Sequence, residues 1–159
     1  MIKKFVPQKP KSIPFTQLAY QKMEKKFADL TEERTKILVR LQTAREMGDL
    51  SENGAYKYAK FELGNTDREL RRLTHLLKYG KVTKNKKTGK VDFGSKITLQ
   101  KDGVQTTFTM VNHHESNPQK QKLSTDSPIG KAVMGKKVGD KITVTAPAGE
   151  TTYTLTKIG

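Results

Sequence analysis

The chain has 159 residues, a formal net charge of +15 and no cysteine. This length suits one or two small domains, and the absence of cysteine excludes disulfides and thiolate metal sites and agrees with a reducing cytoplasm. No apolar run approaches the roughly 20 residues of a membrane helix, and the basic start lacks the apolar stretch of a signal peptide. We therefore expect a cytoplasmic protein without a membrane partner.

The charge is distributed unevenly along the chain. Residues 1–15 carry a net charge of +4 and residues 81–159 a net charge of +8, whereas residues 16–80 carry only +3. A field of this size attracts polyanionic partners through steering and counterion release. Because net charge also keeps a protein soluble, it does not by itself identify a nucleic-acid-binding protein.

Residues 1–15 contain three prolines and four lysines, a composition typical of an unstructured basic arm. Thr16 is a favourable N-cap residue, and Pro14 disfavours helix just before it. We therefore predict that a first helix begins at Thr16 and ends near Met47.

Residues 16–80 carry the spacing of a coiled coil, with apolar residues alternating in steps of three and four. The apolar positions are Tyr20, Met23, Phe27, Leu30, Ile37, Leu41 and Ala44, followed by Tyr56, Ala59, Leu63, Leu70, Leu73 and Leu77. Only Arg34 and Thr66 interrupt the two series. The pattern predicts two helices, the second running from about Ser51 to Tyr79 and ending before Gly80.

The connection near residue 50 is so short that the chain must reverse direction between the two helices. The register of the two apolar series supports this reversal. Facing residues have numbers that sum to about 100, as for Ala44 with Tyr56 and Ile37 with Leu63. The two interruptions, Arg34 and Thr66, fall in the same layer. We predict an antiparallel hairpin on the order of 40 Å long, from a rise of about 1.5 Å per residue.

The predicted tip of this hairpin is acidic on a basic chain, with Glu46, Asp49 and Glu52 within seven residues. One interpretation is structural: Gly48 ends the first helix, Asp49 caps the second, and Glu52 completes a variant capping box. The other is functional, because a capped helix start also holds two carboxylates rigidly at an exposed point. The two roles are compatible.

Residues 81–159 switch to the two-residue period of β-strands after a basic linker at residues 81–90. Strands are predicted at residues 96–99, 106–111, 141–145 and 151–158, and one short helix at residues 128–134, capped by Ser127 with Pro128 in its first position. His113 and His114 lack further ligands at metal-binding spacing. We predict an α+β protein, with the coiled-coil hairpin followed by a small antiparallel sheet domain that serves as a binding module.

Three motifs resemble those of the bacterial Gre transcript-cleavage factors, in the same order and spacing. They are residues 44–53 followed by Tyr56, residues 127–140, and residues 146–150. The resemblance covers nearly the whole chain after about residue 13. The second motif is closer to GreA and the third to GreB, so the subtype stays open. Met47 stands where the family commonly has His, and Gly54-Ala55 replaces a usual Ala-Glu, from which we expect weaker or differently tuned cleavage.

The resemblance implies a fold, a partner and a mechanism. In this family a C-terminal domain similar in fold to FK506-binding proteins docks at the rim of the RNA polymerase secondary channel. The coiled coil enters the channel, where its tip assists cleavage of backtracked nascent RNA at the RNA 3′ end. By this resemblance Asp49 helps to hold a second Mg²⁺ shared with polymerase, and Glu52 orients or deprotonates the attacking water.

The same resemblance implies that the free protein is a monomer without a cofactor and is not itself an enzyme. Further contacts with polymerase or RNA are expected at Arg45, Ser51, Asn53, Tyr56, Ser127, Pro128, Lys136 and Lys137. Two alternatives stay open: a secondary-channel regulator that does not stimulate cleavage, and a coiled-coil protein drawn to RNA or DNA by charge alone.

Overall fold

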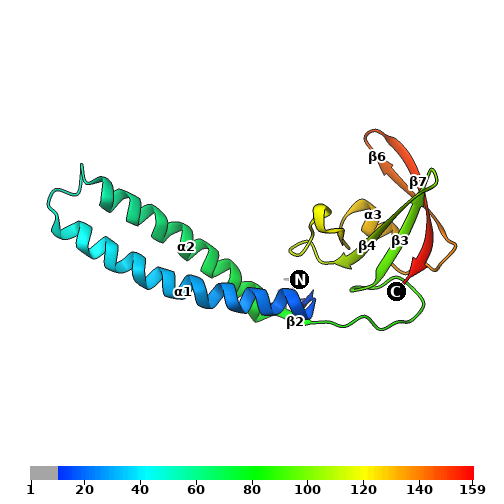
Figure 1. The fold of residues 1–159 in the computed structure, drawn as a ribbon, viewed down its shortest axis with the longest axis horizontal. Helices are drawn as coiled ribbons and strands as arrows, with labels where there is room; N and C mark the ends of the chain where they lie inside the picture. The colour runs from blue at the N-terminus through cyan, green and yellow to red at the C-terminus, as the bar shows by residue number, and fades with distance from the viewer. Residues whose placement is uncertain (1–10) are drawn as a thin grey trace, which may run out of the picture. The chain divides into compact units, whose positions relative to one another are not determined.

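The computed structural model describes residues 11–159, which separate into two compact units (Figure 1). One unit contains Tyr20–Gly80, and the other combines Ile13–Ala19 with Lys81–Gly159. No helix in this described part of the chain has the length and apolarity that crossing a membrane requires. Residues 1–10 of the predicted basic arm lie outside the described residues.

The prediction of an unstructured arm through residue 15 is wrong at its end, because Ile13–Phe15 form strand β1. This strand pairs with β2 (Gly80–Val82), and the Phe15 carbonyl accepts a hydrogen bond from the Thr83 backbone N–H at 2.9 Å. The Phe15 side chain is buried, and its ring stacks on His114. Burial of an aromatic ring and long-range hydrogen bonds therefore outweigh the local proline and lysine composition.

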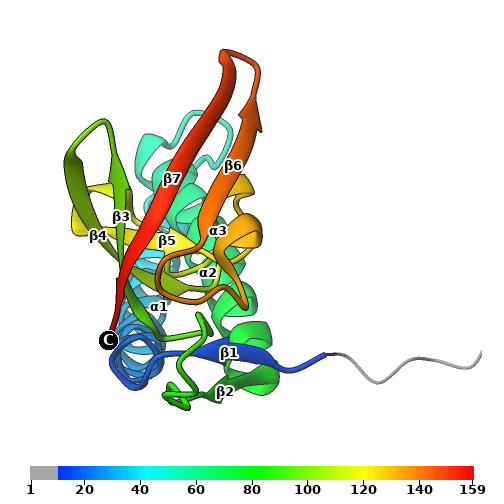
Figure 2. The same ribbon diagram turned by 90° about the vertical axis from the view of Figure 1, so that its right-hand side faces the viewer.

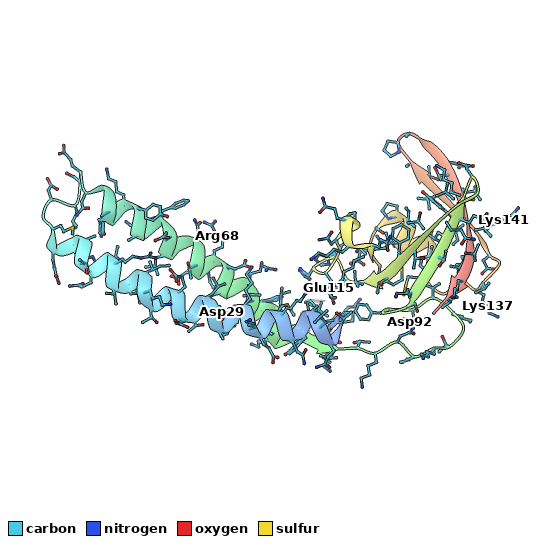
Figure 3. The ribbon with its side chains drawn as sticks, viewed as in Figure 1. Asp29, Arg68, Asp92, Glu115, Lys137 and Lys141 are labelled. Atoms are coloured by element: carbon cyan, nitrogen blue, oxygen red, sulfur yellow. The ribbon has the colours of Figure 1, made fainter. Side chains whose placement is uncertain are left out.

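Helix α1 (Gln17–Glu46) begins at the predicted cap. The Thr16 hydroxyl oxygen accepts a hydrogen bond from the Ala19 N–H at 3.3 Å, as an N-cap does. A distant carboxylate, Glu115, adds a second anchor, since its two oxygens accept from the Thr16 backbone N–H at 2.8 Å and from the Thr16 hydroxyl at 2.7 Å. Glu115 is labelled in Figure 3.

Helix α2 (Gly54–Tyr79) runs antiparallel to α1, as predicted (Figure 1). Every predicted seam residue is buried or half-buried. The most buried hairpin residues are Ile37, Leu41, Ala44, Ala59, Leu73 and Leu76, of which only Leu76 lay outside the predicted seam. Tyr20 donates its hydroxyl hydrogen to the Leu77 carbonyl at 3.1 Å, which joins the two helices at the end opposite the tip.

Ion pairs line the hairpin outside the seam. In the layer where the apolar pattern breaks, the Arg34 guanidinium meets Asp67 at 2.6 Å, one residue from Thr66. In another layer Glu69 accepts from Arg72 on its own helix and from Lys26 on α1, with an N–O distance of 2.7 Å to each. The hydrogen bond from Arg72, then that from Lys26, lowers the pKa of Glu69 from 4.5 to about 2.

The second unit, which we call the sheet unit, contains a five-stranded sheet in the order β5-β4-β3-β7-β6. Figure 2 shows β4, β3, β7 and β6 of this sheet. Their bounds are β3 Lys96–Lys101, β4 Val104–Val111, β5 Lys122–Ser124, β6 Lys141–Ala146 and β7 Gly149–Ile158. The four predicted strands are confirmed, but the prediction of a wholly antiparallel sheet is wrong, because β5 pairs with β4 in parallel. A short 3-10 helix, η1 (Pro118–Lys120), precedes the left-handed residue Gln121, which leads directly into β5.

One face of the sheet carries the core and is covered by α3 (Pro128–Val133). Ser127 caps this helix as predicted, because its hydroxyl oxygen accepts from the Gly130 N–H at 3.0 Å. The same hydroxyl donates to the Ser124 carbonyl at 2.7 Å. Gly130 lies so close to that carbonyl that a β-carbon on it would be 1.9 Å from the oxygen. Glycine is therefore required for α3 to seat against β5.

Replacing Gly130 by alanine should destabilise the sheet unit by about 1–3 kcal/mol, because the added methyl group meets backbone that cannot move aside. Gly64→Ala is the matched control: this glycine lies within α2, with open space around its Cβ position, and alanine there should stabilise by up to about 1 kcal/mol. Urea unfolding followed by circular dichroism measures both. Equal effects of the two substitutions would contradict the close packing of Gly130.

Replacing Glu69 by glutamine should lower the free energy of unfolding of the hairpin by about 1 kcal/mol at pH 7, the upper range for partly exposed ion pairs. Because the folded-state pKa is lowered, the stabilisation is complete above pH 4.5 and is lost as the pH falls towards 2. Thermal unfolding of both proteins between pH 2 and 7 should therefore show curves that converge at the acid end. A constant difference across this range would refute the ion-pair account.

Candidate functional site: the hairpin tip and the sheet unit

The tip is the turn at residues 47–53, which joins α1 to α2 at the free end of the hairpin (Figure 1). Helix α1 ends at Glu46, and the Met47 N–H donates to the Ala44 carbonyl at 3.3 Å. Gly48 follows with φ of +118°, which residues with a side chain rarely adopt. The predicted glycine stop of the first helix is therefore confirmed, and it turns the chain sharply into the acidic segment.

The predicted capping roles of Asp49 and Glu52 are wrong, because α2 begins at Gly54 and not near Ser51. Asp49 instead closes a small turn: its Oδ1 accepts from both the backbone N–H and the hydroxyl of Ser51, each at 2.9 Å. These two hydrogen bonds, the backbone one foremost, lower the pKa of Asp49 below its usual 3.8. The two hydrogen bonds orient the carboxylate through Oδ1 and leave its second oxygen, Oδ2, for an external ligand.

Asn53 is the residue that caps α2 and also clamps the tip. Its Oδ1 accepts from the Tyr56 N–H at 3.0 Å, and its Nδ2 donates to the Ala44 carbonyl at 2.7 Å. One side chain thus satisfies a free donor at the start of α2 and bonds to the last turn of α1, where the Ala44 carbonyl also accepts from Met47. The sequence pointed to Asp49 as the cap of the second helix, because Asp and Asn are both favoured at the N-cap position. Only the observed start of α2 at Gly54 shows that Asn53 is the cap.

The other predicted tip contacts also have internal partners. The Arg45 guanidinium carbon lies 5.8 Å from the centroid of the Tyr56 ring, a cation–π distance, and Tyr56 is half-buried in the seam. Ser51 is held by Asp49. These contacts give the residues a structural role, and their contact with polymerase or RNA stays a prediction.

The acidic side chains at the tip differ in their surroundings. Glu46, Asp49 and Glu52 are all exposed; Glu46 accepts a hydrogen bond from Gln42 at 3.1 Å, and Asp49 accepts from Ser51. Among residues 11–159 no group of three or more His, Cys, Asp or Glu is arranged to hold a metal. Because Mg²⁺ takes about six oxygen ligands, an ion held by Asp49 would need further oxygens from water and from a second molecule.

The remaining predicted contacts lie in the sheet unit. Ser127 and Pro128 form the start of α3, with the Ser127 hydroxyl used for capping and Pro128 exposed. Lys136 and Lys137 lie in the turn that follows α3, and Lys137 is labelled in Figure 3. The Lys137 N–H donates to the Asp140 carboxylate at 2.9 Å, which orders the turn and leaves both ammonium groups exposed. The predicted contacts therefore fall into two groups, one in each unit.

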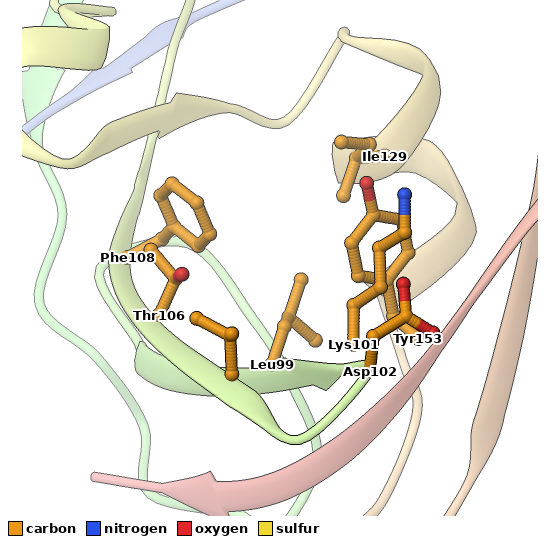
Figure 4. A pocket seen from close by; sticks show the side chains of 8 residues that line it. Leu99, Lys101, Asp102, Thr106, Phe108, Ile129 and Tyr153 are labelled. Carbon is orange, nitrogen blue, oxygen red and sulfur yellow. The ribbon is translucent and has the colours of Figure 1, made fainter.

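Sequence reasoning missed an apolar cavity of about 350 Å³ beside α3 (Figure 4). Leu99 and the rings of Phe108 and Tyr153 line it, with Ile129 contributed by α3. The cavity lies beside the first turn of α3, and Lys101, Asp102 and Thr106 also line it. The period of two in β3 and β4 predicted the strands, but not which of their side chains meet α3 and β7 around a cavity.

Two family models match consecutive parts of the chain. Residues 13–82 match the model described as the N-terminal part of a transcription elongation factor. Residues 85–159 match the model described as the C-terminal part of the transcription elongation factors GreA and GreB. The two matches meet at the linker and together cover almost all the described residues.

Individual relatives agree with these matches. The protein called transcription elongation factor GreA in Chloroflexus aggregans is 38% identical over 133 residues, which span 81% of this chain and 85% of that protein. Its namesake in a Nitratiruptor species is 36% identical over 149 residues, 91% of each chain. Among solved structures, the GreA factor homolog 1 of Thermus thermophilus aligns over 94% of this chain and 99% of its own, with 22% identity and a TM-score of 0.45.

Replacing Asn53 by alanine should lower the free energy of unfolding of the hairpin by about 1–2 kcal/mol, because the change removes both the cap of α2 and the bond to Ala44. Asn65→Ala provides the matched control, since Asn65 is an exposed residue within α2 and alanine is the better helix former. Urea unfolding and amide exchange at residues 49–57 measure the effect. Unchanged exchange at the tip would show that Asn53 does not clamp it.

Proposed function

The chain belongs to the GreA/GreB family of transcription elongation factors, and on this basis we propose that it stimulates the endonuclease activity of bacterial RNA polymerase. Its substrate complex would be a backtracked polymerase whose nascent RNA 3′ end has left the active centre. The protein would act in the cytoplasm as a monomer and a cofactor of polymerase, without nuclease activity of its own.

The observation that carries this proposal is the state of Asp49. Its carboxylate is exposed at the free end of the hairpin, is oriented by two hydrogen bonds from Ser51 that also lower its pKa, and retains one oxygen for an external ligand. Placed in the polymerase secondary channel, such a group can reach an active centre that the rest of the protein does not enter. Held on the turn by two hydrogen bonds, the carboxylate needs little reorganisation before it binds.

In the proposed mechanism Asp49 supplies one oxygen ligand to an Mg²⁺ ion whose other ligands come from water and polymerase. When bound, the ion would stabilise the negative charge that develops on the phosphodiester during hydrolysis. Glu52 lies three residues further along the exposed turn and would orient the attacking water or accept its proton. Asn53 positions both groups by fixing the turn between the helix ends.

The sheet unit would hold the protein on polymerase. We propose that Ser127 and Pro128, with the exposed Lys136 and Lys137, contact the rim of the secondary channel. The net charge of +8 in residues 81–159 supports an acidic docking surface on the partner. Docking through one unit leaves the hairpin of the other free to act inside the channel.

The second candidate function is a secondary-channel regulator that binds polymerase without stimulating cleavage. Two features favour it: the exposed Met47, where the family commonly has His, and Gly54-Ala55, where an acid next to the tip is missing. In that case Asp49 and Ser51 would only stabilise the turn.

A transcript-cleavage assay separates the two functions. Wild-type protein should release short 3′ fragments from a backtracked complex that carries 3′-labelled RNA, and the double variant Asp49→Asn, Glu52→Gln should do so at least about 100-fold more slowly, since it lacks a metal ligand and a proton acceptor. Glu46→Gln is the matched control, because this acid bonds to Gln42 and should leave cleavage unchanged.

Binding to polymerase is measured in parallel, so that loss of cleavage can be distinguished from loss of binding. If both proteins bind and only the wild type releases fragments, the cleavage role belongs to the tip acids. If both bind and neither releases RNA, the protein is a non-cleaving regulator and the main proposal fails.

A further inference from the structure

The surface of the hairpin changes character along its length. Away from the tip it is covered by ion pairs, including Lys26 with Glu69 and Arg34 with Asp67, and Figure 3 labels the exposed Asp29 and Arg68 there. Near the tip, large apolar side chains are exposed to water as well. They are Leu38, Val39, Met47, Leu50, Tyr58 and Phe61, whereas the rest of the two helices exposes only Leu18, at the start of α1.

Several of these side chains line one groove between the two helices, which we name the tip groove. It is lined by Val39, Thr43 and Met47 on one side and by Ala55 and Tyr58 on the other, and it encloses about 310 Å³. Val39 and Tyr58 are each 63% exposed and Met47 is 72% exposed. Exposed apolar side chains that gather in one groove indicate an interaction surface, whereas single ones do not.

The charges at the groove indicate what kind of partner it fits. Arg40 lines its inner end and is paired with Glu33 at 3.0 Å and with Glu62 at 3.1 Å. The lining therefore offers no unpaired cation to neutralise a phosphate group, which binding of an RNA backbone requires. An uncharged, apolar surface matches it better, and such surfaces are provided by protein side chains.

We propose that the tip groove binds apolar side chains of a polymerase segment that lines the secondary channel, an inference that rests on the proposed function. The groove reaches the turn at Met47, two residues before Asp49. Contact there would fix the depth and rotation of the hairpin in the channel, so that Asp49 and Glu52 meet the active centre in one orientation. The occupant is an aliphatic or aromatic side chain of a protein segment.

The test compares exposed apolar side chains that line the groove with one that does not. The double variant Val39→Ser, Tyr58→Ser truncates one large side chain on each side of the groove, and Phe61→Ser removes a 67% exposed ring that does not line it. Serine has a helix propensity close to those of the residues replaced, and none of the three lies in the seam. Each variant competes with fluorescently labelled wild-type protein for binding. The competition measures the affinity of the variant for two targets, polymerase without nucleic acid and a backtracked elongation complex.

We expect the double variant to bind both forms of polymerase at least about tenfold more weakly, as for a truncated interface anchor, and Phe61→Ser to bind as the wild type does. Met47→Gln, which lies in the turn and cannot disturb a helix, should also weaken binding. Equal affinities for all variants would overturn the proposal, as would a loss seen only with extruded RNA, which would identify RNA as the occupant. Failure of the wild type itself to bind polymerase would overturn the proposed function as well.

Discussion

The apolar seam between α1 and α2 is the constraint on which the geometry of the tip depends. Its residues fix the register in which the two helices pass each other, from Tyr20 beside Leu77 to Ala44 beside the start of α2. Because the helix ends meet in this register, Asn53 reaches the carbonyl of Ala44 and holds the turn closed. A shift of one helical turn would move the end of α1 by about 5.4 Å and break that bond. The position of Asp49 is therefore set by packing along the whole hairpin.

Charged and apolar side chains are distributed differently along the hairpin. Ion pairs such as Lys26 with Glu69 neutralise each other on the helix surfaces away from the tip and contribute modestly to stability. Near the tip the surface instead combines the exposed carboxyl groups of Asp49 and Glu52 with exposed apolar side chains. Exposure of apolar side chains does not stabilise the free protein; under the proposed function they would contact polymerase while the two acids meet its active centre.

The sheet unit supports a separate role. Its core is closed on one side by α3, whose seat depends on Gly130 and on the Ser127 cap. Beside the first turn of α3 the sheet carries the cavity lined by Phe108 and Tyr153. Under the proposed function the exposed lysines of this unit would dock on polymerase, and a preformed surface of this kind needs no conformational change to bind.

Local patterns in the sequence were sufficient for the hairpin, its register, the four long strands and the caps at Thr16 and Ser127. Each of these depends on residues close in the chain or on a periodicity that repeats, and the physical preference involved is strong. The tip acids could likewise be located from the sequence, because acidic residues clustered at a predicted turn are visible without coordinates. Their capping roles could not, because Asp49 and Asn53 have similar preferences for an N-cap.

Only the tertiary structure decided the features that depend on distant residues. Strand β1 forms because Phe15 finds a buried site beside His114, and β5 runs parallel to β4 because the chain returns alongside it after η1. The anchor from Glu115 to Thr16, the tip groove and the cavity beside α3 each combine side chains that no local pattern connects. Contacts of this kind depend on the free energy of the whole packed chain. The sequence by itself therefore determined the elements that have a strong local pattern, and the packing decided β1, β5 and the surfaces that the elements present.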